Sequence, residues 1–133
     1  MAKDKSNQAE TERVPIKWRD DVAEHDYAAA LAYLSLKLDG DEAGKAVARL
    51  RKEKLTTRRA NDILRASGLT PVPLDDPGVV KDLIKVIEGK ELSPVLVVGG
   101  IPGGTDIADG FHRVSLVYQV DPYGDVPLKL AEM

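Results

Sequence analysis

The amino-acid sequence predicts an α+β fold in which helices come first and a small mixed sheet follows. In the first half of the chain, apolar residues recur at the spacing typical of amphipathic helices. In the second half, Val95 to Val98 form an unbroken apolar run, which favours a strand buried on both faces. The chain has 133 residues, 43% of them hydrophobic and 31% charged, as expected for one soluble globular domain.

The first 68 residues are expected to be helical after a polar start. Residues 1–12 should form a loose, disordered tail, and residues 13–68 a helical N-terminal extension. Its first helix should begin near His25 and end at Gly40, and Asp41 is expected to cap the second. The apolar residues that share a face in these two helices are Tyr27, Leu31, Leu34, Leu38, Ala43, Ala46, Val47 and Leu50.

Two further helices are expected before the first strand. The earlier one should begin near Thr56 or Thr57 and end at Gly68. Residues 69–74 contain prolines and should be an extended connector or an edge strand. The later helix should begin after Asp76, which caps it, with a proline in its first turn. The inward apolar residues are Ala60, Ile63 and Leu64 in the earlier helix and Val80, Leu83, Ile84 and Ile87 in the later one.

The remaining residues should complete the sheet. After the strand at 95–98, the glycine-rich residues 99–104 should form a flexible loop, which suits either a ligand or a plain hairpin. Strands are expected at 105–108 and 126–130. A helix should lie between these strands, with Val114, Val117 and Tyr118 facing inward.

The clearest candidate site is the point where a short apolar strand passes through Asp109 and Gly110 into a helix. A helix start suits an anion, because its first N–H groups have no intrahelical partner and its dipole adds about half a positive charge. Arg113 would add a fork of donors for a phosphate, and His112 would add more. The sequence therefore predicts a phosphate or nucleotide site. A local turn, with a capping histidine and a solvated arginine, stays open as the alternative.

From Asp75 onward the chain resembles the ParB/sulfiredoxin superfamily. The segments that carry the resemblance, in the order in which the superfamily has them, are Ser93 to Val98, Asp109 to Arg113, Val114 to Val120 and Val126 to Leu130. The resemblance implies that residues 69–133 form a small mixed sheet with packed helices, in one compact unit with the helical extension. It also implies nucleotide or phosphate binding.

Within that superfamily, Asp109-Gly110-Phe111-His112-Arg113 is most similar to the D-G-H-H-R of the free-serine-kinase branch. Sulfiredoxins carry a catalytic cysteine where this chain has Phe111, so sulfiredoxin catalysis is excluded. ParB proteins bind CTP at a similar signature and carry a DNA-reading helix-turn-helix after it, which is not expected in the residues that follow Arg113. An ATP-dependent small-molecule kinase therefore stays open.

The resemblance also implies roles for single residues. The ligand would be a nucleoside triphosphate, ATP or CTP, with Mg²⁺, and Asp109 would be the catalytic and metal-binding residue. An aspartate before a helix also serves as a cap, so that interpretation of Asp109 stays open. Asp75 or Asp76 is the candidate for the carboxylate base that such kinases need. The residues that would contact the nucleotide are Ser93, Gly110, Phe111, His112 and Arg113.

A basic segment suggests a different function, a nucleic-acid-binding or partner-binding adapter without catalysis. A local basic patch can bind a nucleic-acid backbone. However, a solvated face with salt bridges explains the same charges, and the net charge of −3 gives no general attraction to nucleic acid or to anionic membranes. The oligomeric state stays open as well. The residues assigned to this alternative are Arg51, Lys54, Arg58 and Arg59.

Composition excludes several classes of site. The chain has no cysteine, which excludes a disulfide, a thiolate ligand and a thiol nucleophile, and its two histidines lie far apart in the sequence. No apolar run approaches the roughly 18 residues that span a bilayer, and the N-terminus lacks the apolar core of a signal peptide. A cytoplasmic protein without a membrane partner is expected.

Overall fold

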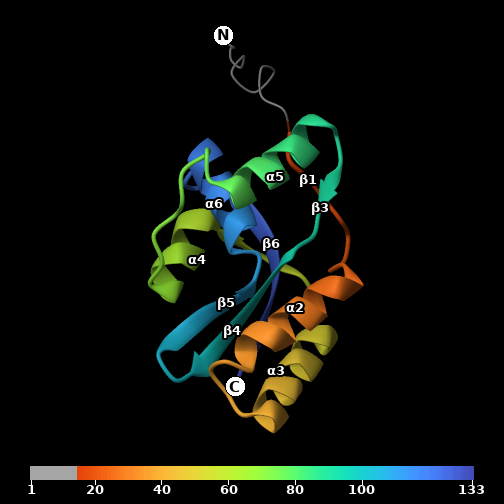
Figure 1. Ribbon diagram of the computed structural model, residues 1–133, viewed down its shortest axis with the longest axis vertical. Coiled ribbons are helices and arrows are strands. Elements are labelled where there is room, and N and C mark those ends of the chain that lie inside the picture. The colour runs from red at the N-terminus through yellow and green to blue at the C-terminus, as the bar shows by residue number, and fades with distance from the viewer. Residues whose placement is uncertain (1–14) are drawn as a thin grey trace.

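The computed structural model describes residues 15–133, and its mixture of helices and strands confirms the α+β class (Figure 1). The expected tail of residues 1–12 lies outside the described residues. The elements in chain order are β1 (Lys17–Trp18), α2 (Glu24–Leu34), α3 (Gly40–Lys52), β2 (Thr56–Arg59), α4 (Ala60–Ser67), α5 (Pro77–Ile87), β3 (Glu91–Leu92), β4 (Val95–Ile101), β5 (Gly104–Asp109), α6 (Phe111–Val120) and β6 (Asp125–Glu132).

A four-stranded mixed sheet forms the centre of the molecule, with the strand order β2-β6-β4-β5. The central pair β4 and β6 is parallel, and both edge strands are antiparallel to their neighbours. Strands β1 and β3 form a separate parallel pair. Helices α2 and α3 cover one face of the sheet, and α4 and α6 cover the other, so the molecule has three layers (Figure 1). None of the helices within residues 15–133 has the length and apolar character needed to cross a bilayer.

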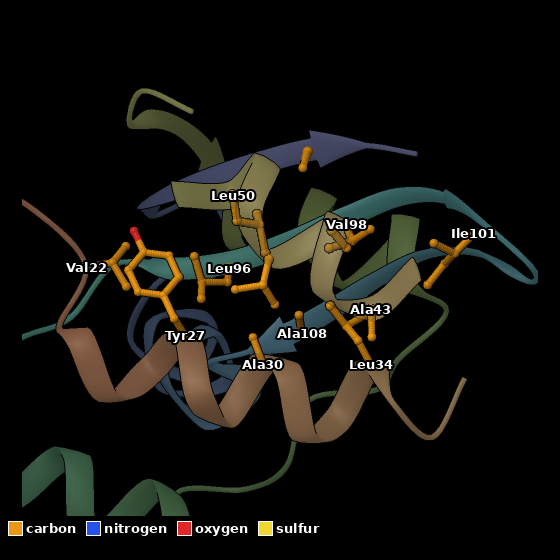
Figure 2. Packing of buried hydrophobic residues seen from close by; sticks show 13 residues of the cluster. Val22, Tyr27, Ala30, Leu34, Ala43, Leu50, Leu96, Val98, Ile101 and Ala108 are labelled. Carbon is orange, nitrogen blue, oxygen red and sulfur yellow. The ribbon is translucent and has the colours of Figure 1, made fainter. Parts of the chain in front are cut away.

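Strand β4 is buried on both faces, as its apolar run predicts. Leu96 and Val98 point toward α2 and α3 and belong to the same buried cluster as Tyr27 and Leu34 (Figure 2). Val95 and Val97 point the other way and pack in the cluster formed with α4 and α6. Successive side chains of a strand alternate between faces, so one run of valine and leucine supplies both cores.

The expectation of a helix beginning near Thr56 or Thr57 is wrong. Residues Thr56–Arg59 are strand β2, which pairs antiparallel with β6, and α4 begins only at Ala60. The β-branched threonines favour a strand, and pairing with β6 satisfies their backbone groups. The helical extension of residues 13–68 therefore also contributes an edge strand to the sheet. The end of α4 at Gly68, in the left-handed conformation with φ 67°, is as expected.

Two other local expectations also need correction. The cap of α3 is Asp39, not Asp41: its carboxylate accepts a hydrogen bond from the Glu42 N–H at 2.8 Å. The expected glycine loop is mostly strand, because β4 continues to Ile101 and β5 starts at Gly104. Only Pro102 and Gly103 form the turn, and the φ of 93° at Gly103 suits a Pro-Gly turn.

The buried stripe of α5 is also rotated from the expected one. Val79 and Val86 are the buried residues of this helix, whereas Ile84 and Ile87 are 49% and 62% exposed. The buried pair packs against Leu92 and against Leu116 of α6. Apolar residues occupy both sides of this helix, so spacing alone could not choose the inner one. Its start is as expected, since Asp76 accepts hydrogen bonds from the N–H groups of the first turn.

Capping of α3 by Asp39 gives a test of this local structure. Asp39→Ala should lower the free energy of unfolding by about 1 kcal/mol, because the Glu42 N–H loses its acceptor. The matched control is Asp41→Ala, which removes a carboxylate of the first turn but no cap, and should change the stability less. Urea unfolding of both variants measures the difference. A larger loss for Asp41→Ala would contradict the assignment.

Candidate functional site

A pocket of about 540 Å³ lies where β5 ends and α6 begins. Its walls come from residues 23–26 at the start of α2, from α5, from the β3 segment that ends at Ser93, and from residues 109–113. This volume lies in the range of small-molecule sites, roughly 300–1,000 Å³. The pocket therefore lies beside the starts of α2 and α6 and beside α5, and takes residues from both halves of the chain.

The start of α6 opens into this pocket. Gly110 precedes the helix with φ 112°, and a Cβ placed there would lie 2.8 Å from a methyl carbon of Val95. Both the backbone angle and the space therefore require glycine. Because Gly110 has no side chain, it cannot cap the helix, and Phe111 and His112 line the pocket beside it. The positive end of the α6 dipole thus faces the pocket.

Arg113 is the centre of an ion cluster in the pocket wall. Its Nη1 donates to Oδ2 of Asp26 at 3.1 Å and to the Ser93 carbonyl at 2.6 Å, and its Nη2 donates to Oδ2 of Asp109 at 2.5 Å. The Arg113 and Asp26 side chains are only 12% and 8% exposed. Protein oxygens therefore hold Arg113 in the pocket wall, but one N–H of Nη2 and the Nε–H have no acceptor within residues 15–133, so a contact between Arg113 and a phosphate stays a prediction.

Asp109, the predicted catalytic and metal-binding residue, belongs to the same cluster. Burial raises the pKa of its carboxyl, the nearby Asp26 raises it further, and the positive charge of Arg113 opposes both effects. Its carboxylate accepts from Arg113 rather than capping α6. Among residues 15–133, no group of three or more histidine, cysteine, aspartate or glutamate side chains is arranged to hold a metal ion.

His112 lies at the rim of the pocket against the start of α5. Its Nε2 is 3.4 Å from Oδ2 of Asp76, and its side chain is half exposed. A Cβ on Gly78 would lie 2.4 Å from the imidazole ring, so only glycine allows this close approach. The Phe111 ring packs edge-on against the same imidazole. These contacts fix where His112 lies at the pocket rim.

The other predicted residues have structural roles in the pocket wall or lie outside it. The Ser93 hydroxyl accepts from the Ala23 N–H at 2.9 Å, which helps to hold the start of α2. Asp76 caps α5, and Asp75, the other candidate base, is exposed and does not line the pocket. Ser93 does line it, so a contact between its side chain and a ligand stays a prediction.

Sequence analysis missed the charged residues that α5 brings to the pocket. Lys81, Asp82 and Lys85 all line it, and none of them forms an ion pair with another residue in the described part of the chain. Burial raises the pKa of Asp82, while Arg113 and Lys85 oppose that shift. The i, i+4 spacing of the two lysines is a signal that they share a face. The sequence did not show that this face lines a pocket, because the expected buried stripe of α5 differs from the observed one.

The four basic residues of the adapter hypothesis have different surroundings, and their role in binding a nucleic acid stays a prediction. Arg51 pairs with Glu24 at 2.6 Å and lies over the Tyr27 ring. Arg58 lines a separate pocket of about 220 Å³, whereas Arg59 lies over the Tyr123 ring. Neighbouring residues of a strand point to opposite faces, so these two arginines point in different directions. The fourth residue, Lys54, lies exposed in the loop before β2.

The Arg113 cluster predicts a stability effect. Arg113→Ala should lower the free energy of unfolding by about 3 kcal/mol, because it leaves the buried Asp26 and the partly buried Asp109 carboxylates without their partner. Arg65→Ala is the control, since Arg65 makes a solvent-exposed pair whose loss should change stability by less than about 1 kcal/mol. Chemical denaturation measures both. Equal effects would contradict the assigned role.

Asp82 predicts a pH dependence. A carboxyl whose pKa is raised in the folded state stabilises the protein below the unfolded pKa and loses that contribution as the pH rises through the folded value. Asp82→Asn should therefore have a higher melting temperature than wild type at pH 7. This gain should become smaller as the pH falls toward 3.8, the ordinary pKa of an aspartate. The exposed Asp75→Asn is the control and should show little change. A gain that grows as the pH falls would contradict this assignment.

Comparison of the chain with protein-family models, with curated proteins and with solved structures gave no match. The resemblance to the ParB/sulfiredoxin superfamily thus stays a prediction carried by the segments quoted for it. Function must be inferred from the pocket itself.

Proposed function

We propose that this protein binds a phosphate-bearing ligand in the pocket at the start of α6. The observation that carries the proposal is the combination, in one pocket, of an open helix N-terminus with two lysines that form no ion pair within residues 15–133. Residues Gly110 to His112 present the positive end of α6, and Lys81 and Lys85 approach from α5. Helix N-termini and lysines are the groups with which proteins commonly hold phosphate oxygens.

The lysines are well placed for this role. Lys81 and Lys85 are one turn apart on α5, so they lie on the same side of that helix. Arg19 adds a further positive charge in the pocket wall. Since neither lysine pairs with a carboxylate of the described residues, both remain available to an anion. Arg113 then acts mainly by holding the wall in place.

A nucleotide, ATP or CTP with Mg²⁺, is the ligand class that the resemblance favours. Asp109 is the residue that would contact the metal, and Mg²⁺ needs only one or two protein carboxylates beside phosphate oxygens. The pocket volume of about 540 Å³ is adequate for a ligand of that kind. Kinase activity would further require an acceptor, which the pocket does not identify.

Binding of phosphate ligands tests the proposal. Calorimetry with ATP, CTP, GTP and UTP, each with and without Mg²⁺, and with inorganic phosphate should show saturable binding to the wild-type protein. Lys85→Ala should weaken it by about tenfold, because a charge-assisted contact is lost. The matched control is Lys90→Ala, since Lys90 pairs with Glu88 outside the pocket. Absence of binding to all of these ligands, or equal affinity for Lys85→Ala and wild type, would contradict the proposal.

A further inference from the structure

We propose that Asp82 binds an ammonium group of the ligand, so that the pocket takes a small zwitterionic phosphate ester. This inference rests on the proposed phosphate site and specifies its substrate class. The two charged ends of such a ligand would contact different parts of the pocket. The phosphate would lie at the start of α6 beside the lysines, and the ammonium would contact the Asp82 carboxylate.

The balance of charges in the pocket carries the first step. Its lining contains as many acidic as strongly basic side chains. The basic ones are Arg19, Lys81, Lys85 and Arg113, and the acidic ones are Asp26, Asp82, Glu91 and Asp109. A pocket built only for a polyanion would be expected to carry an excess of positive charge.

The Arg113 cluster accounts for only part of this balance. Asp26 and Asp109 are both bonded to Arg113, so they belong to the protein's own ion cluster. Glu91 is exposed and therefore solvated. Asp82 differs from all three, because it is half-buried and has no hydrogen-bond or ion-pair partner within residues 15–133.

A partly buried carboxylate without a partner is an unfavourable arrangement that a positively charged ligand group would relieve. Lys81 and Lys85 lie on the same helix but form no ion pair with Asp82 among the described contacts. A bound ammonium group would supply the missing contact. The same carboxylate would repel the added charge of a triphosphate, so it would favour the zwitterion over a nucleotide.

Matched ligand pairs test this inference. Phosphoethanolamine and 3-aminopropyl phosphate carry an ammonium group, and propyl phosphate and butyl phosphate are their counterparts of the same length with a methyl group in its place. At pH 7, calorimetry should show that at least one ammonium ester binds wild type about tenfold more tightly than its counterpart. In Asp82→Asn this preference should disappear, while the alkyl phosphates should bind equally well or more tightly.

Two further variants, Asp75→Asn and Glu91→Gln, test whether the preference for the ammonium ester depends on Asp82 alone. Asp75→Asn removes an exposed carboxylate outside the pocket and should keep the preference for the ammonium ester. Equal binding of both members of each pair, persistence of the preference in Asp82→Asn, or its loss in Glu91→Gln instead would overturn the role of Asp82 while leaving the phosphate site standing. If no phosphate ester and no nucleotide binds, the proposed function itself fails.

Discussion

Arg113 bonds to groups from three separate parts of the chain, and the position of the pocket depends on those bonds. Its guanidinium reaches Asp26 in α2, the Ser93 carbonyl before β4, and Asp109 at the end of β5. Burying a charge is unfavourable unless its partners are held in place, so this cluster constrains all of these segments together. The start of α6 is therefore held close to the start of α2, and both line the pocket.

This constraint changes how the helix start can bind an anion. An arginine after Asp-Gly suggests a free donor, yet here the positive charge of Arg113 already faces two carboxylates. In the proposed site, attraction for a phosphate would come mainly from the backbone N–H groups of α6 and from Lys81 and Lys85. Ligand binding as proposed therefore depends on α5, a helix that the sequence motif does not include.

Sequence patterns predicted the features that depend on neighbouring residues, such as helix ends. They failed for features that depend on a partner far away in the sequence. Asp76 before Pro77 and Gly68 after α4 mark helix ends by rules that act within one turn, and both are confirmed. Residues Thr56–Arg59 form a strand because β6, much later in the chain, pairs with them. In the site, the place of Gly110 was predictable, but the contact between Asp26 and Arg113 was not, because it joins residues far apart in the sequence.

The N-terminal half is therefore part of the site rather than an appendage to it. Residues 23–26 form one wall of the pocket, and β2 covers the edge of β6. Leu96 and Val98 of β4 are buried only because α2 and α3 pack over them (Figure 2). Because Arg113 joins α2 to the end of β5, the wall of the pocket and the packing of α2 depend on the same ion cluster.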